Sequence, residues 1–254
     1  MIHTQALPGT PGYGGSPQPI IRKALDEARI YVDQGIQALM IENMHDVPYL
    51  KRTAGPEITA MMTHIASAIK QRFPHIPLGI QILAGANLQA LAAALASGAD
   101  FIRAEGFVFG HLADEGYMDA QAGELLRYRK NISGEHIAIF ADIKKKHSSH
   151  ALSADTDITD HAHAAEFFLA DGLIITGNST GQAVNKAELE KLQASTSLPV
   201  LIGSGVTDRN LAELFPLADG FIVGSYFKED GLWSKAIDPE KVRTLVRIHE
   251  SLSH

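Results

Sequence analysis

Acidic and basic residues follow one apolar run of the sequence at short spacing, in "IAIFADIKKKHSSH" (137–150). If this run is a strand, period-two alternation puts Asp142, Lys144 and Lys146 on one side, and Ile143 and Lys145 on the other. A lysine at the end of a buried strand can form a Schiff base, hold an oxyanion or bind phosphate. The alternative is a solvated run of charge on a loop, which fits Lys145 better than Lys144.

Three further ionisable residues end or interrupt apolar runs: His3 in "MIHTQ", Glu42 in "ALMIE" and Arg103 in "FIRA". Glu42 and Asp142 are candidates for an acid–base pair, or for carboxylates that fix nearby cations by ion pairing. Arg103 is suited to bind a carboxylate or phosphate, and His3 is either a general base or a buried hydrogen-bonded histidine. A purely structural network is the alternative for the whole group. The predicted catalytic residues are Lys144, Asp142, Glu42, His3 and Arg103.

Two glycine–serine turns follow the last two apolar runs, in "LIGSGVTDRN" (201–210) and "FIVGSYFK" (221–228). Glycine lets a phosphate approach the backbone amides closely, and serine adds a hydroxyl donor. The alternative is that each glycine only makes a tight turn. Because the turns occur in two consecutive units, we expect phosphate binding. The predicted binding residues are Gly203, Ser204, Gly205, Gly224 and Ser225, together with Gly177, Asn43 and Lys146.

The elements that must position these residues alternate along the chain. Eight short apolar runs predict strands at 1–5, 38–42, 78–83, 101–104, 137–143, 172–176, 199–203 and 220–224. Between them, helical patterns span 19–33, 57–73, 87–96, 119–132, 159–170, 186–194, 208–214 and 239–252. Strands that read as apolar runs are typical of a parallel sheet covered on both faces.

Eight strand–helix units predict an α/β fold, a single (β/α)8 TIM-like barrel, with the chemistry at the carboxyl ends of its strands. An open doubly wound sheet is less favoured, because no GxGxxG follows the first strand. Asp238 and Asp208 are expected to cap helices, and long loops at 5–17, 43–57 and 106–119 are expected to cover the pocket.

Composition restricts the class of protein. Apolar residues make up 45% of the 254 residues and charged residues 20%, and the net charge is −7. Such a chain disfavours non-specific binding to nucleic acid or to an anionic membrane surface. There is no cysteine, which excludes disulfides, thiolate metal sites and cysteine nucleophiles. No apolar run is long enough to span a bilayer and no signal-peptide pattern opens the sequence, so we expect one cytoplasmic domain over 1–254.

Histidines resemble a metal cluster only by number. His161 and His163 stand two residues apart and so face different sides of a helix, and no HExxH occurs. We therefore predict no cofactor and no metal. Ala-rich helix faces such as "LQALAAALA" predict a homo-oligomer, and many other barrels form one.

Several of these segments resemble one known family. "MIHTQALPGTPGY", "IENMHDVPY", "ADIKKKHSSH", "GLIITGNSTGQ", "IGSGVTDRN" and "GSYFKEDG" are similar to signature segments of the BtpA family, which includes SgcQ-type proteins linked with sugar operons. The resemblance covers nearly the whole chain and implies a TIM-like barrel. This chain has "HTQALPG" for the usual "HLPPLPG", and "IKKKHS" for a typical "VKVKHA". The residues carried over are Leu7-Pro8-Gly9, Glu42-Asn43, Asp46, Asp142, Lys144, Lys146-His147, Thr176-Gly177, Thr180-Gly181 and Gly203-Ser204-Gly205.

Two classes of function follow. The first is an enzyme of lyase, isomerase or hydrolase type that acts on a phosphorylated sugar or nucleoside-type metabolite. The second is a non-catalytic assembly factor, implied by the family's association with photosystem I accumulation. A triphosphatase is less favoured because the sequence lacks a P-loop. We expect a small phosphorylated metabolite as partner, and no nucleic acid.

Overall fold

A computed structural model describes residues 1–144, 148–149, 151–177 and 184–253, with the backbone alone at Lys144 and Ser148. Within these residues eight strands form one sheet in the order β1-β2-β3-β4-β7-β9-β10-β11. These strands are Ile2–His3, Leu39–Glu42, Leu78–Gln81, Phe101–Ala104, Ala138–Lys144, Gly172–Ile175, Val200–Ile202 and Gly220–Phe221. The order follows the sequence, and neighbouring strands pair in parallel where the structure describes their register. A doubly wound sheet would reverse its order partway, so the predicted (β/α)8 class is confirmed and the alternative is wrong.

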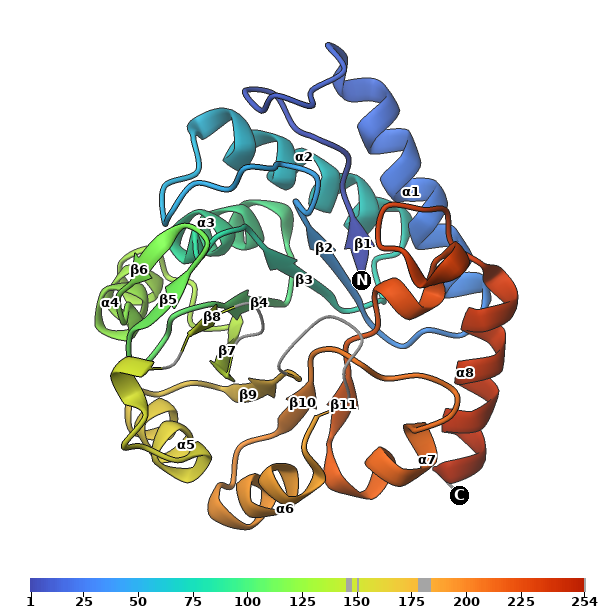
Figure 1. Cartoon of the computed structure of the whole chain (residues 1–254). Helices are drawn as coiled ribbons and strands as arrows, with labels where there is room; N and C mark the ends of the chain where they lie inside the picture. The colour runs from blue at the N-terminus through green and yellow to red at the C-terminus, as the bar shows by residue number, and fades with distance from the viewer. Residues whose placement is uncertain (145–147, 150, 178–183, 254) are drawn as a thin grey trace. The chain divides into compact units, whose positions relative to one another are not determined.

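A helix follows each of these strands in the sequence (Figure 1). They are α1 (Pro17–Asp33), α2 (Pro56–Arg72), α3 (Asn87–Ser97), α4 (Ala122–Asn131), α5 (Ile158–Phe167), α6 (Lys186–Ser195), α7 (Leu211–Leu214) and α8 (Pro239–Leu252). Short 3₁₀ turns complete the list: η1 (Ala151–Ser153), η2 (Phe215–Leu217), η3 (Ser225–Phe227) and η4 (Glu229–Gly231). Asp238 caps α8 as predicted, by accepting from the amides of Glu240 and Lys241. The prediction for Asp208 is wrong, because α7 begins later, with Asn210 at its N-cap.

The chain divides into two compact units: Met1–Ala104 with Gly123–Ile139, and Glu105–Ala122 with Phe140–His254. We refer to them as unit 1 and unit 2. In unit 1, strands β1 to β4 lie side by side, with α1, α2 and α3 packed along them (Figure 1). Helix α2 turns an apolar face to the core through residues such as Ile58, Met62 and Ile65, which are 6% exposed or less. Helix α3 buries Ala90, Ala93 and Ala94 in the same core, so its Ala-rich face is used inside unit 1.

Unit 2 contains a feature that the sequence patterns did not predict. A second, three-stranded antiparallel sheet has the order β6-β5-β8, with strands at His111–Ala113 (β5), Gly116–Met118 (β6) and Ser148–Ser149 (β8). The hairpin β5–β6 lies inside the segment that we expected to be a long loop. Its inner residues, His111 and Met118, are paired and buried, whereas Leu112 and Tyr117 are paired and exposed. The hairpin therefore has one buried face and one exposed face.

Candidate functional site

In unit 1, polar residues line up at the carboxyl ends of adjacent strands. The strand register pairs His3 with Glu42, and Glu42 with Gln81. Strands β3 and β4 pair Ile80 with Ile102, and Gln81 and Arg103 are the next residues along these two strands. All four side chains are nine-tenths or more buried. His3 Nε2 lies 3.5 Å from a carboxylate oxygen of Glu42. The registers of β1 to β4 therefore place the predicted residues His3, Glu42 and Arg103 in one row across the strand ends.

The loop after β2 is held by a second group of buried polar residues. Asp46 accepts from the backbone amide of Leu7 at 2.8 Å and from the Asn43 side chain at 2.9 Å. The oxygen of the Asn43 amide accepts from the backbone of Leu83 at 2.7 Å. Burial raises the pKa of Asp46, against the effect of these two hydrogen bonds. Asn43, a predicted phosphate ligand, thus joins the strand ends to the N-terminal loop.

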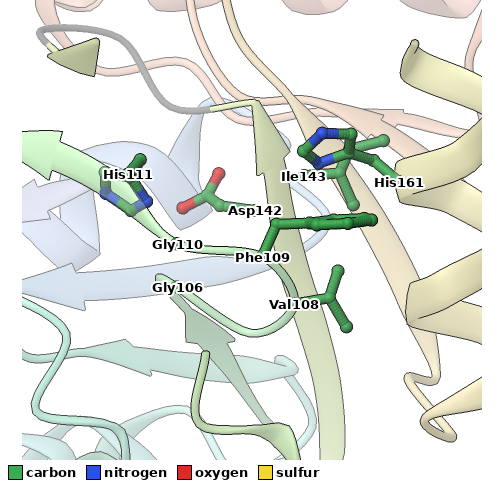
Figure 2. A pocket seen from close by; sticks show the side chains of 8 residues that line it. All are labelled: Gly106, Val108, Phe109, Gly110, His111, Asp142, Ile143 and His161. Atoms are coloured by element: carbon green, nitrogen blue, oxygen red, sulfur yellow. The ribbon is translucent and has the colours of Figure 1, made fainter. Parts of the chain in front are cut away.

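In unit 2, the predicted residue Asp142 lines a small pocket (Figure 2). Its side chain is 5% exposed and points toward the ring of His111. His161, from α5, is 8% exposed and lines the same pocket. The remaining lining residues are Gly106, Val108, Phe109, Gly110 and Ile143. The pocket therefore combines three buried ionisable side chains with apolar walls.

Local structure fixes the positions of the two histidines. His111 is carried by the hairpin β5–β6, whose inner face it shares with Met118. Helix α5, which carries His161, starts with a capping box in which Asp157 and Asp160 accept each other's backbone amides. Hydrogen bonds from Lys191 and Thr159 hold the pKa of Asp157 well below its usual range, so this cap is ionised at neutral pH.

The lysines of the opening segment are only partly described. Lys144 ends β7, where its backbone pairs with Ile175, and Lys146 lies outside the described residues. The register shifts between Asp142 and Lys144, because two steps along β7 match one step along β9. Such a bulge interrupts period-two alternation. The expectation that Lys144 shares the face of Asp142 therefore no longer follows from the strand pattern.

The first glycine–serine turn has one feature that suits a ligand. Gly203 donates its amide to Ile175 O at 2.8 Å, so this amide continues the sheet and is engaged. The Ser204 hydroxyl oxygen is buried and has no hydrogen-bond partner among the described residues. Gly205 has a φ of +78°, a conformation that glycine adopts without strain. Asn210 fixes the turn by donating to Gly205 O at 2.8 Å.

The second turn is built differently. Gly224 and Ser225 are half-buried and lead into η3, where their carbonyls accept from Phe227 and Lys228. The helices after the two turns, α7 and η3, have four and three residues, so helix dipoles add little to anion binding here. Gly177, the remaining predicted residue, is buried directly after β9. The two turns and Gly177 all belong to unit 2.

Sequence reasoning missed three residues. His111 could have been found from the alternation on either side of "DEG", which is typical of a hairpin. His161 was considered only as a metal ligand. Lys228 is 1% exposed, although it stands in a charged segment where no pattern indicates burial. Its carbonyl accepts from Lys241 Nζ at 2.8 Å. Among the described residues, no group of three His, Asp or Glu side chains is placed to hold a metal ion.

Comparison with known proteins gives whole-chain matches. The sequence model of the BtpA family matches residues 1–251 of this chain. An uncharacterized mitochondrial protein of Caenorhabditis elegans is 47% identical over 251 residues, which cover 97% of this chain and 90% of the relative. The photosystem I biogenesis protein BtpA of Synechocystis is 34% identical over 247 residues, covering 97% and 85%.

Solved structures with the same fold are more distant in sequence. Thiamine phosphate pyrophosphorylase from Pyrococcus furiosus aligns with a TM-score of 0.59 at 16% identity, covering 91% of each chain. Phosphoribosyl anthranilate isomerase from Thermus thermophilus aligns with a TM-score of 0.59 at 18% identity, covering 90% of this chain and 94% of the isomerase. Identities this low support the fold alone. In the part of the chain that the structure describes, no helix is long and apolar enough to cross a membrane.

Proposed function

This chain belongs to the BtpA family, and from that premise we propose that it is an enzyme that acts on a small phosphorylated metabolite of the sugar or nucleoside type. The reaction is of the lyase, isomerase or hydrolase type. The observation that carries the phosphate assignment is the buried Ser204 hydroxyl, which has no hydrogen-bond partner among the described residues. A buried hydroxyl of this kind costs free energy unless a ligand completes its hydrogen bonds.

The flanking turn is consistent with an anion. Gly205 adopts a positive φ, and Asn210 holds the turn by donating to Gly205 O and accepting from the Thr207 amide, each at 2.8 Å. Neighbours of the same fold carry names such as thiamine phosphate pyrophosphorylase and phosphoribosyl anthranilate isomerase, which refer to phosphorylated compounds. The loops after the last two strands are a frequent phosphate site in such barrels.

The catalytic part of the proposal rests on buried ionisable side chains. Unit 1 offers His3, Glu42 and Arg103 in one register row, and unit 2 offers Asp142 in its pocket. Buried acids and bases at strand ends are suited to proton transfer. Lys144 is proposed as the residue that forms a Schiff base or stabilises an anion, with Asp142 of the same unit handling protons.

The experiment is a screen for ligand-induced stabilisation of the full chain. Matched pairs of sugars and sugar phosphates, nucleosides and nucleotides, and inorganic phosphate are tested for a rise in Tm. The proposal expects phosphorylated members to stabilise the chain and their unphosphorylated partners to have no effect. Equal behaviour of both members across all pairs would contradict it.

The second candidate is a non-catalytic assembly factor. It is favoured by the name of the Synechocystis relative and by three consecutive exposed apolar residues, Phe167, Phe168 and Leu169, with Phe167 81% exposed. Exposed apolar patches mark protein contacts. This candidate expects no phosphorylated compound to stabilise the chain, so the same screen separates the two functions.

Assembly and location remain proposals. We propose a homo-oligomer, although the Ala-rich face of α3 cannot form its interface because Ala90 and Ala93 are buried within unit 1. A monomeric mass in light scattering at micromolar concentration would contradict it. We also propose a cytoplasmic location, whereas the name of the worm relative indicates the mitochondrion for that protein. Fractionation of the source cells distinguishes these locations.

A further inference from the structure

Helix α5 ends in a Schellman motif that has a leucine where glycine is usual. Ala170 donates its amide to Ala165 O at 3.0 Å, and Leu169 donates to Glu166 O at 2.9 Å. Leu169 has a φ of +62°, in the left-handed region that a bulky residue rarely adopts. Glycine would take this position without strain, so the leucine is kept here at a cost in conformational free energy.

The same turn exposes apolar surface. Phe167 is 81% exposed, Phe168 44% and Leu169 66%, and the two phenylalanine rings lie edge to face with centroids 5.6 Å apart. We refer to these three residues as the α5 patch. Leaving large apolar side chains in water forgoes the free energy of burying them. Backbone strain and apolar exposure at one turn are together typical of a surface that contacts another molecule.

The charge near the α5 patch is mainly negative. Residues 147–185 contain five acidic residues and no lysine or arginine. Two of these acids, Glu166 and Asp171, flank the patch along the chain. Helix α6 packs beside α5 and contributes two lysines, each of which already has an acidic partner. These ion pairs are Lys186 with Glu213 at 3.5 Å and Lys191 with Asp157 at 2.7 Å.

The size and the charge of the patch restrict its partner. The exposed parts of the three side chains amount to roughly 300–400 Å² of apolar surface. Each partner of a stable complex buries about 800 Å², so the patch suits a short segment better than an extensive interface. A second copy that met this one at the same patch would bring like charges together, and an anionic lipid surface would be repelled for the same reason.

We propose that the α5 patch docks a short segment of another protein, in which apolar side chains are flanked by lysine or arginine. The apolar side chains of this segment cover Phe167 and Leu169, and its cations lie near Glu166 and Asp171. The patch contains none of the residues assigned to phosphate binding or to catalysis. The inference therefore goes beyond the proposed enzymatic function and does not depend on it.

Three labelled peptides test the chemistry of the partner with the full chain. Leucine and phenylalanine alternate with lysine in the first peptide; the second has glutamate for every lysine, and the third has serine for every apolar residue. Fluorescence anisotropy should show saturable binding of the first peptide, weakened by added salt, and binding of the other two that is weaker by on the order of tenfold or more. Absence of binding by the lysine peptide, or equal affinity for it and either of the others, would overturn the proposal.

Two serine variants locate the binding on the surface. Phe167→Ser should weaken binding of the lysine peptide by on the order of tenfold. Leu152→Ser is the matched control, because it removes another exposed apolar side chain from the same acidic stretch, and it should leave the affinity unchanged. Equal affinities of the two variants would contradict docking at the α5 patch.

Leu169→Gly separates docking from folding. Glycine relieves the left-handed strain, so the Tm of this variant should rise. The variant also removes an apolar side chain from the patch, so the lysine peptide should bind it more weakly. Opposite changes of stability and affinity cannot come from a loss of folded structure. Full affinity or a lower Tm in this variant would overturn the proposal.

The other possible occupants are tested with Phe167→Ser. Light scattering in which this variant dissociates an oligomer would assign the patch to a second copy. Binding of the wild type, and not of the variant, to neutral phosphatidylcholine vesicles would assign it to lipid. Either result overturns the proposal. Phosphorylated compounds should stabilise Phe167→Ser and the wild type equally, so the docking surface and the proposed function can fail separately.

Discussion

The Asn43 side-chain amide donates to the carboxylate of Asp46 over 2.9 Å, and this contact fixes the carboxylate just beyond the end of β2. Asp46 completes the link by accepting from the backbone of Leu7. Removal of the carboxylate would leave both donors without an acceptor. Because both are buried, water could not easily replace it. The pair therefore anchors the "ALPG" segment over the strand ends of unit 1.

Asp46→Ala should lower the free energy of unfolding by about 2–4 kcal/mol at neutral pH, because two buried donors are left without acceptors. Urea unfolding measures the change. Asp114→Ala, at an exposed position of the turn between β5 and β6, is the control and should be near neutral.

The contribution of Asp46 to the free energy of unfolding should also depend on pH. Burial raises the pKa of its carboxyl, so the part of its contribution to stability that depends on protonation is fully present below the unfolded pKa and is lost as the pH rises through the folded pKa. The stability difference between wild type and Asp46→Ala should therefore grow as the pH falls from 7 toward 4. A difference that shrinks over this range would contradict the assignment.

Ser204→Ala should have opposite effects on stability and on binding. The chain without ligand should gain up to about 1 kcal/mol, because a buried hydroxyl without a partner is removed. Affinity for inorganic phosphate, measured by calorimetry, should fall on the order of tenfold, since one hydrogen bond to a charged group is lost. Ser251→Ala, on the exposed end of α8, should change neither quantity. Unchanged phosphate affinity in Ser204→Ala would exclude this turn as the site.

Lys144→Met tests the catalytic lysine once a substrate is found. Turnover should fall on the order of a hundredfold, as for loss of a preorganised charge donor. A Schiff-base lysine would also be trapped by borohydride with a carbonyl substrate, as a mass shift on Lys144. Lys235→Met, at an exposed position, should keep full turnover. The role is refuted if Lys144→Met retains both turnover and ligand affinity.

Gly79→Ala should destabilise the chain by about 1–3 kcal/mol through overpacking. Gly79 in β3 pairs with Phe101 in β4, and an added Cβ would lie 2.1 Å from the Phe101 ring. Gly172 has the same relation to Phe140. Gly14→Ala, where nothing lies within 4 Å of the added Cβ, should not destabilise. Thermal unfolding of the two variants provides the comparison, and equal Tm values would refute the packing argument.

Asp238→Ala should lower the free energy of unfolding by about 0.5–2 kcal/mol, because the Asp238 carboxylate caps α8 by accepting from two backbone amides. Ser16→Ala at the N-cap of α1 should cost less, since Ser16 makes no capping bond and its hydroxyl donates to Gln18 instead. Chemical denaturation of the two variants measures this difference. Equal losses would contradict the cap assignment.

The fold was predictable because its strands are apolar runs. The segment predicted at 101–104 is β4 itself, and the run at 78–83 became β3 (Leu78–Gln81). The hairpin β5–β6 was not predicted, because its strands have three residues each and one exposed face. Short strands leave too little periodicity to distinguish them from a loop.

The site was predictable only as a set of strand ends. His3, Glu42 and Arg103 share a register row because parallel strands align their carboxyl ends. The face of Lys144 was not predictable, because a bulge leaves no signal in the residue types.

The division of the chain into units has a consequence for synthesis on the ribosome. Unit 1 consists of Met1–Ala104 and Gly123–Ile139, and the intervening residues belong to unit 2. A nascent chain that has emerged only to Ala104 lacks α4 and the start of β7, so unit 1 cannot be completed until the β5–β6 hairpin has already left the exit tunnel. During that interval the edge of β4, which the start of β7 later covers through the bond from the Ala138 amide to Asp100 O, is open to other chains and to chaperones.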